Sequence, residues 1–170
     1  MRRGRSRCCP EVDSYAQLIA LLDSHGASYR LIDHPPEGRT EVVSRMRPND
    51  LRASAKCIVL LLKLGKKVTR YVLAVIPGDA RIDFAAVRDV FGASYVAFAS
   101  ADKAQELSGA VSGAVLPFSF NPQLEPVVDP DLLTNEELFF NAGRLDRSMA
   151  LRTQDYLAIA KPRIAAIALH

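Results

Sequence analysis

Two short segments of this chain carry residue types that suit chemistry. The first is Lys56, a single lysine that opens the apolar run from Cys57 to Leu62. The second is the glycine–proline segment from Gly113 to Pro117. A cation and fixed backbone N–H groups suit an ester or acyl substrate, because both stabilise negative charge that develops on a carbonyl oxygen. The alternative is that Lys56 only covers apolar surface with its methylene stem, beside an ordinary turn.

Signatures of other catalytic classes are missing from the sequence. It contains no Ser or Cys in a nucleophile motif, no clustered His/Cys ligands and no phosphate-binding glycine loop. Its three cysteines, Cys8, Cys9 and Cys57, have neither a disulfide framework nor zinc spacing. We therefore expect no metal, no cofactor and a cytoplasmic location.

Charge and hydropathy limit the partners. The net charge of +3 comes from 22 basic and 19 acidic residues, but four of the arginines lie within the first seven positions. The near-neutral remainder does not support a basic face for DNA, and no apolar run approaches the roughly 20 residues of a membrane span. We expect residues 1–12 to be a disordered basic extension, with an arm that contacts RNA phosphates as the alternative. Residues 13–170 should form one domain.

Periodicity and turn residues predict the elements that position the two segments. Expected helices cover 14–25, 84–91, 101–107 and 154–168, the last kinked at Pro162, with a weak helix over 41–55 that breaks near Pro48. Expected strands cover 29–32, 56–62, 70–76, 94–98, 114–116, 126–128 and 138–141. Without a strict βαβ alternation, this order indicates an α/β (α+β) domain with a mixed sheet.

Several motifs occur in a specific order. They are His34-Pro35-Pro36, Lys56 at a strand start, the turn from Val75 to Asp83, Gly113-x-x-x-Pro117-Phe118 and Asn141-Ala142-Gly143-Arg144. In this order and spacing the chain resembles the aminoacyl-tRNA editing family of YbaK/EbsC type, from Tyr15 to Tyr156. The resemblance implies a single domain with a twisted, barrel-like mixed sheet flanked by helices, like the editing domain of prolyl-tRNA synthetase.

The resemblance also implies an activity and roles for residues. Family members hydrolyse the ester between a wrong amino acid and the 3′-terminal adenosine of a tRNA, usually tRNA(Pro). Lys56 would bind the terminal phosphate or hold the ester end, and amides of the loop from Gly113 to Pro117 would stabilise the oxyanion. Gly113 would let the backbone approach a ligand closely. Lys56, Gly113 and Pro117 are thus the predicted catalytic residues.

The predicted substrate-binding residues are Ala114, Val115, Leu116, His34, Asn141 and Arg144. Leu116 stands where many relatives carry Ser or Thr. If it faces the pocket it favours a small apolar amino acid such as alanine or 2-aminobutyrate, and otherwise it belongs to the core. His34 has packing or capping as its alternative role, and Arg144 has a surface ion pair. Cys57 should lie in the core, on the strand face opposite Lys56.

The implied partner is the aminoacylated 3′ end of a tRNA, with prolyl-tRNA synthetase as a further candidate. The alternative to a deacylase is a non-catalytic module that binds aminoacyl-tRNA or a nucleotide and works through a synthetase. A near-neutral body favours help from a partner, because tRNA affinity without a basic face should be weak. The sequence leaves the oligomeric state open.

Overall fold

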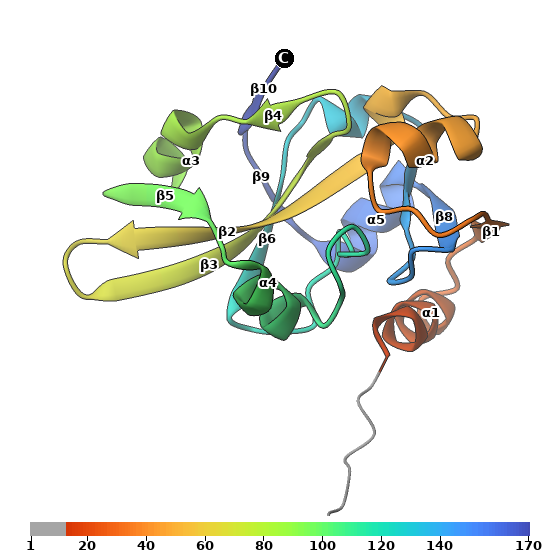
Figure 1. The fold of residues 1–170 in the computed structure, drawn as a ribbon, viewed down its shortest axis with the longest axis horizontal. Helices are drawn as coiled ribbons and strands as arrows, with labels where there is room; N and C mark the ends of the chain where they lie inside the picture. Colours follow the sequence, from red (N-terminus) through yellow and green to blue (C-terminus); the bar gives the residue numbers. More distant parts are fainter. Residues whose placement is uncertain (1–12) are drawn as a thin grey trace, which may run out of the picture.

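A long hairpin forms the centre of the fold (Figure 1). In this computed structural model, which describes residues 13–170, β2 (Ala55–Leu64) pairs antiparallel with β3 (Val68–Pro77). The predicted extension at 1–12 lies outside the described residues. β5 (Tyr95–Phe98) adds antiparallel to β2, while β6 (Leu124–Val128) and then β9 (Arg163–Ile164) add in parallel beyond β3. The five strands confirm the predicted mixed sheet.

Two smaller sheets complete the strand arrangement. β8 (Arg147–Arg152) lies between β1 (Tyr29–Asp33) and β7 (Glu137–Asn141), antiparallel to both. β4 (Arg81–Ile82) pairs with β10 (Ala168–Leu169). A bridge between Ser54 and Phe139 links the start of β2 to β7. Within the described chain the sheets curve past one another without closing into a barrel.

Helices flank these sheets, and side-chain caps begin several of them. The helices are α1 (Ser14–Ser24), α2 (Thr40–Met46), α3 (Phe84–Phe91), α4 (Ala101–Ser108) and α5 (Thr153–Ala160), with 3-10 turns η1 (Leu51–Ala53) and η2 (Leu132–Thr134). The Asp83 side chain accepts from the Ala86 amide and the Ser100 hydroxyl from the Lys103 amide. Such caps satisfy N–H groups that a helix leaves unpaired.

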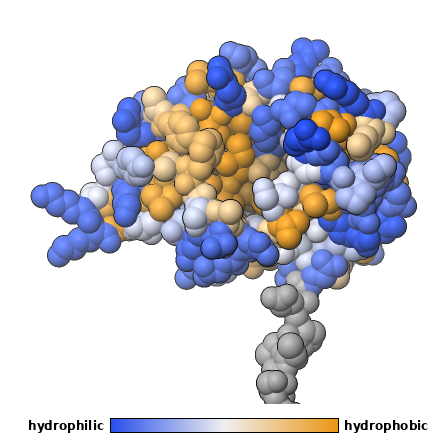
Figure 2. Space-filling model, in the orientation of Figure 1, coloured by the Kyte–Doolittle hydropathy of each residue, from blue (hydrophilic) through white to orange (hydrophobic). Residues whose placement is uncertain are grey.

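Both faces of β2 are covered, which explains its continuous apolar run. On one face Ala55 and Val59 join a core with Leu116 and Tyr156. On the other face Leu60 and its neighbours pack towards α3 and β4. Figure 2 shows hydrophobic surface over the region of α3, β5 and β2, bordered by hydrophilic residues. Residues that alternate along β2 therefore belong to two different environments.

Two predictions about elements were wrong, and one central strand was missed. The last helix ends at Ala160, because Pro162 cannot continue it, and the chain turns through Lys161 into β9 and β10. Residues 114–116 form a loop, with the Ala114 amide donating to the Val111 carbonyl oxygen at 3.0 Å. Strand β8 was not predicted at all, although it is the central strand of its sheet.

Candidate functional site

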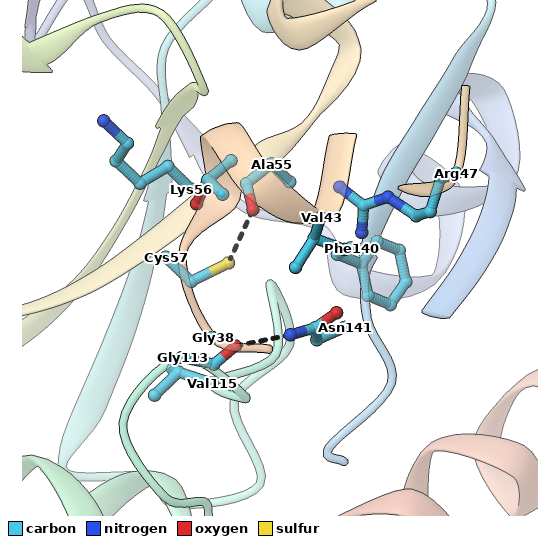
Figure 3. Close-up of a pocket in the computed structure, with 11 residues that line it drawn as sticks. Gly38, Val43, Arg47, Ala55, Lys56, Cys57, Gly113, Val115, Phe140 and Asn141 are labelled. Carbon is cyan, nitrogen blue, oxygen red and sulfur yellow. Dashed lines mark hydrogen bonds between the residues drawn. The ribbon is translucent and has the colours of Figure 1, made fainter. Parts of the chain in front are cut away.

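A small cavity of about 200 Å³ lies where β2 begins (Figure 3). Residues from α2, β2, β7 and the loop after α4 surround it. They are Gly38, Thr40, Val43, Arg47, Ala55, Lys56, Cys57, Gly113, Val115, Phe140 and Asn141. The structure therefore brings four of the predicted site residues, Lys56, Gly113, Val115 and Asn141, to one cavity.

Lys56 lines this cavity, but its ammonium group points away from the loop (Figure 3). The Nζ atom donates to the Ala80 carbonyl oxygen at 3.0 Å and lies 3.9 Å from a Glu41 carboxylate oxygen. Strand alternation explains this direction, because Lys56 shares a face with the core near Ala80. The side chain keeps 24% exposure. In this conformation the cation lies at the solvent side of the cavity and does not contact Gly113.

Cys57 takes the opposite face, as predicted, and that is the face on which the loop packs. Its thiol points into the space in front of Gly113 and Val115 and donates to the Ala55 carbonyl oxygen at 3.7 Å. Burial raises the pKa of the Cys57 thiol. A thiol that stays protonated is a poor nucleophile, so the residue forms part of the cavity wall.

The Gly113 backbone packs directly on Gly38. Gly113 has φ +85°, and a Cβ atom added there would lie 2.5 Å from the Gly38 Cα. The Asn141 side-chain amide donates to the Gly113 and Glu37 carbonyl oxygens, each at 2.9 Å. The close approach predicted for Gly113 is therefore made to another backbone segment. Asn141 holds the two segments together from behind.

The loop contains backbone donors that no group of residues 13–170 uses. Within the described chain, the N–H groups of Gly113 and Val115 donate to no protein acceptor, although both residues line the cavity. Fixed amides of this kind are suited to an oxygen that gains negative charge.

Three other loop residues do not reach the cavity. Leu116 is 3% exposed and packs in the core, and Ala114 is fully buried. Pro117 is buried as well, and its carbonyl oxygen accepts from the Tyr156 hydroxyl at 3.0 Å. Leu116 therefore forms no apolar wall for a substrate, because its side chain belongs to the core cluster that includes Phe118 and Tyr156. Pro117 instead secures the exit of the loop.

His34 and Arg144 also lie outside the cavity lining. The His34 Nε2 atom is 2.6 Å from the Ser148 hydroxyl, so the ring supports a residue behind the cavity. Arg144 pairs with Asp146 at 2.9 Å and lies over the Tyr15 ring. For both residues the alternative structural role predicted from sequence agrees with the contacts.

Arg47 is the charged residue among the lining residues that sequence reasoning missed. It is 6% exposed and donates to the hydroxyls of Ser54 and Ser148 at 3.0 Å and to the Asn49 side-chain oxygen at 3.1 Å. It forms no ion pair with a carboxylate of the described chain, and burial lowers its pKa to about 10. Its spacing of four residues from buried Val43 was the only available signal.

The cavity lining has no acid–base residue of the usual kind. Its lining residues within the described chain include no carboxylate and no histidine. Nor does the described part of the chain contain a cluster of three His, Cys, Asp or Glu side chains suited to a metal ion. No described helix has the length and apolar character needed to cross a membrane.

Known proteins resemble this chain over most of its length. The family model of the aminoacyl-tRNA editing domain matches residues 34–159. A protein of Escherichia coli K12, named multifunctional Ser/Thr-tRNA deacylase ProXp-y, is 40% identical over 152 residues, which cover 89% of this chain and 90% of that protein. The prolyl-tRNA editing protein ProX of Acetoanaerobium sticklandii is 25% identical, over 89% and 93% of the two chains.

Solved structures agree on the fold. The hypothetical protein APE2540 superposes with a TM-score of 0.81 at 20% identity, over 90% of this chain and 99% of that one. A structure described as a candidate trans-editing enzyme for prolyl tRNA synthetase gives 0.77 at 19% identity, over 92% and 98%. These matches confirm the resemblance drawn from motif order. The chain therefore belongs to the aminoacyl-tRNA editing domain family, and it is an editing enzyme that acts on aminoacyl-tRNA.

Proposed function

We propose that this protein hydrolyses the ester of tRNA mischarged with serine or threonine, working in trans to a synthetase. The observation that carries the proposal is one cavity that joins free loop amides to a polar wall containing Arg47 and Thr40. The 40% identical relative is named a Ser/Thr-tRNA deacylase, which supports the same substrates. This proposal replaces alanine or 2-aminobutyrate, since the argument for them needed an apolar wall of Leu116 and Val115, and Leu116 lies in the core.

The loop amides would act on the carbonyl group. Water adds to the ester carbon, the carbonyl oxygen becomes an oxyanion, and the bond from carbon to the ribose oxygen then breaks. The ribose oxygen takes up the proton that water loses, so the products are a free amino acid and uncharged tRNA. The amides of Gly113 and Val115 stabilise the oxyanion. Asn141 keeps Gly113 in position through its 2.9 Å bond.

The substrate itself would help the proton transfer. No carboxylate or histidine of the described chain lines the cavity, so a general base from the protein is not at hand. The free hydroxyl of the terminal ribose lies next to the ester in any aminoacyl-tRNA, and it can orient the attacking water. The role left to the protein is positioning together with electrostatic stabilisation.

Lys56 would hold the tRNA rather than the ester carbonyl. Its ammonium is partly exposed beside the cavity, and its bonds to Ala80 and Glu41 are contacts that a phosphate can replace. A lysine that neutralises one phosphate strengthens binding in a salt-dependent way. Prolyl-tRNA synthetase stays a predicted partner. The chain is nearly neutral beyond its first residues, so the single phosphate contact of Lys56 gives little affinity for tRNA. This weak affinity supports the need for a partner.

A panel of mischarged tRNAs tests the proposal. Seryl-, threonyl-, alanyl-, cysteinyl- and 2-aminobutyryl-tRNA, made on one tRNA(Pro) body, are incubated with the full chain and release of labelled amino acid is followed. We expect seryl- and threonyl-tRNA to be hydrolysed fastest. Rates no higher than spontaneous hydrolysis would overturn the deacylase assignment for these tRNAs. Faster release of alanine than of serine would overturn the substrate assignment.

A further inference from the structure

We propose that Arg47 determines substrate specificity by donating a hydrogen bond to the side-chain hydroxyl of the amino acid to be removed. The inference rests on the proposed function and adds the residue that recognises serine and threonine. It starts from an unusual feature, a buried guanidinium at a cavity that pairs with no carboxylate of residues 13–170.

Burying a cation without an ion-pair partner costs hydration free energy, unless other contacts compensate for the lost water. Arg47 is 6% exposed, and its contacts at 3.0–3.1 Å are all to neutral oxygens. Desolvation alone lowers its pKa to about 10, so the group remains charged at neutral pH. A buried charge is normally balanced by an opposite charge. Arg47 is held by neutral oxygens and keeps N–H donors that no group of the described residues uses, so an acceptor atom of a ligand would complete its hydrogen bonding.

The guanidinium still has donors to offer. An arginine carries five N–H groups, and three nitrogens each make one bond to Asn49, Ser148 or Ser54. One N–H on each terminal nitrogen is therefore left over. Figure 3 shows the guanidinium pointing from the end of α2 towards the side of the cavity that Val43 and Phe140 line.

Neighbouring polar groups are already occupied, so they cannot take this role. Both N–H groups of the Asn141 side chain bind carbonyl oxygens, and its oxygen accepts from Ser148 at 2.9 Å. The Ser54 hydroxyl accepts from Arg47 and from Asn49 and lies 2.7 Å from the Ser44 hydroxyl. These contacts fix the guanidinium in one orientation. Thr40 is the other hydroxyl on the lining, and it serves as the competing candidate.

A charged hydrogen-bond donor in a fixed position discriminates between substrates, because a substrate without an acceptor atom leaves the donor unpaired. A serine or threonine hydroxyl accepts the bond, whereas an alanine side chain fills part of the space and leaves the N–H unpaired. Hydrogen bonds to charged groups are the stronger ones, and one such contact corresponds to about a tenfold to hundredfold preference. A methionine in place of Arg47 has similar length and no donor, so it should reverse most of that preference.

The test compares seryl- and alanyl-tRNA, on the same tRNA body, with the full chain and four variants, Arg47→Met, Arg47→Lys, Arg45→Met and Thr40→Val. Arg47→Met should lower kcat/KM for seryl-tRNA by about tenfold to a hundredfold and change the alanyl-tRNA value much less. Arg47→Lys, which keeps the charge and fewer directed donors, should give an intermediate ratio. Arg45→Met is the matched control, because Arg45 lies exposed on the same helix, and it should keep the wild-type ratio. Thermal melts monitored by circular dichroism check folding.

Each outcome decides between the inference and the proposed function. If the wild-type protein prefers seryl-tRNA and Arg47→Met lowers both rates equally, Arg47 is structural and the inference alone fails. If Arg47→Met does not fold, the Arg47→Lys ratio decides, and a wild-type ratio there overturns the inference. The same holds if Thr40→Val, and not a change at Arg47, abolishes the preference. A wild-type protein that does not prefer serine over alanine overturns the proposed function and the inference together.

Discussion

Replacement of Gly113 by alanine tests whether the loop is held by backbone contact with Gly38. The added Cβ would lie 2.5 Å from the Gly38 Cα and 2.8 Å from its carbonyl oxygen. Carbon atoms in contact lie about 3.5 Å apart, so the two segments must separate by about 1 Å. A left-handed conformation adds about 1–2 kcal/mol for a residue with a Cβ, and overpacking adds about 1–3 kcal/mol. We expect the free energy of unfolding to fall by about 2–5 kcal/mol.

The same displacement should also slow deacylation, because it moves the loop amides. A shift of about 1 Å in a positioned catalytic group costs on the order of 10²-fold in rate, so Gly113→Ala should lower kcat/KM for seryl-tRNA by about that factor. Urea denaturation measures the stability, and single-turnover deacylation at a temperature where the variant stays folded measures the rate.

Gly26→Ala is the matched control for the free-energy cost of a left-handed backbone conformation. Gly26 has φ +65° and no atom within 4 Å of an added Cβ. The free energy of unfolding of this variant should fall only by the conformational cost of about 1–2 kcal/mol, and its activity should be unchanged. If Gly113→Ala loses no more stability than Gly26→Ala and retains its rate, the reasoning about the Gly38 contact is refuted.

Three further changes give separate tests. Lys56→Ala should fold normally and lower kcat/KM by about tenfold through a higher KM, as expected for one lost phosphate contact, with the slope of log binding constant against log salt reduced by about one; a kcat/KM within about threefold of wild type would contradict the role of Lys56. Cys57→Ser should retain activity within about tenfold, because a thiol with a raised pKa is not the nucleophile, and complete loss in a folded protein would indicate covalent catalysis instead. His170 lies 2.6 Å from an Asp131 carboxylate oxygen, and the hydrogen bond to Asp131 raises the His170 pKa. Its charged form thus stabilises the fold below about pH 6.5 and loses that effect as the pH rises through the folded-state pKa. His170→Gln should therefore lower Tm in acid and not at alkaline pH, and an equal loss of Tm at both would show that the pair does not act through charge.

Local patterns were enough to predict much of this protein. The apolar run after Lys56 predicted β2 because a strand buried on both faces needs continuous apolar residues. The predicted helix starts at 84 and 101 follow Asp83 and Ser100, whose capping hydrogen bonds reach only three residues along the chain. The order of short motifs indicated the editing family, which the family match over residues 34–159 confirms. These features depend on neighbours in sequence or on residue order.

Contacts between distant residues determined the site itself. Alternation along β2 predicts that Lys56 and Cys57 face opposite ways, but only the packing of the loop shows that Cys57 is on its side. Asn141 reaches Glu37, 104 positions away, and Arg47 reaches Ser148, 101 positions away. No local pattern distinguishes a buried arginine from an exposed one near Pro48. Burial and charge at this cavity arise only when α2, β2, β7 and the loop meet, because each element supplies one wall.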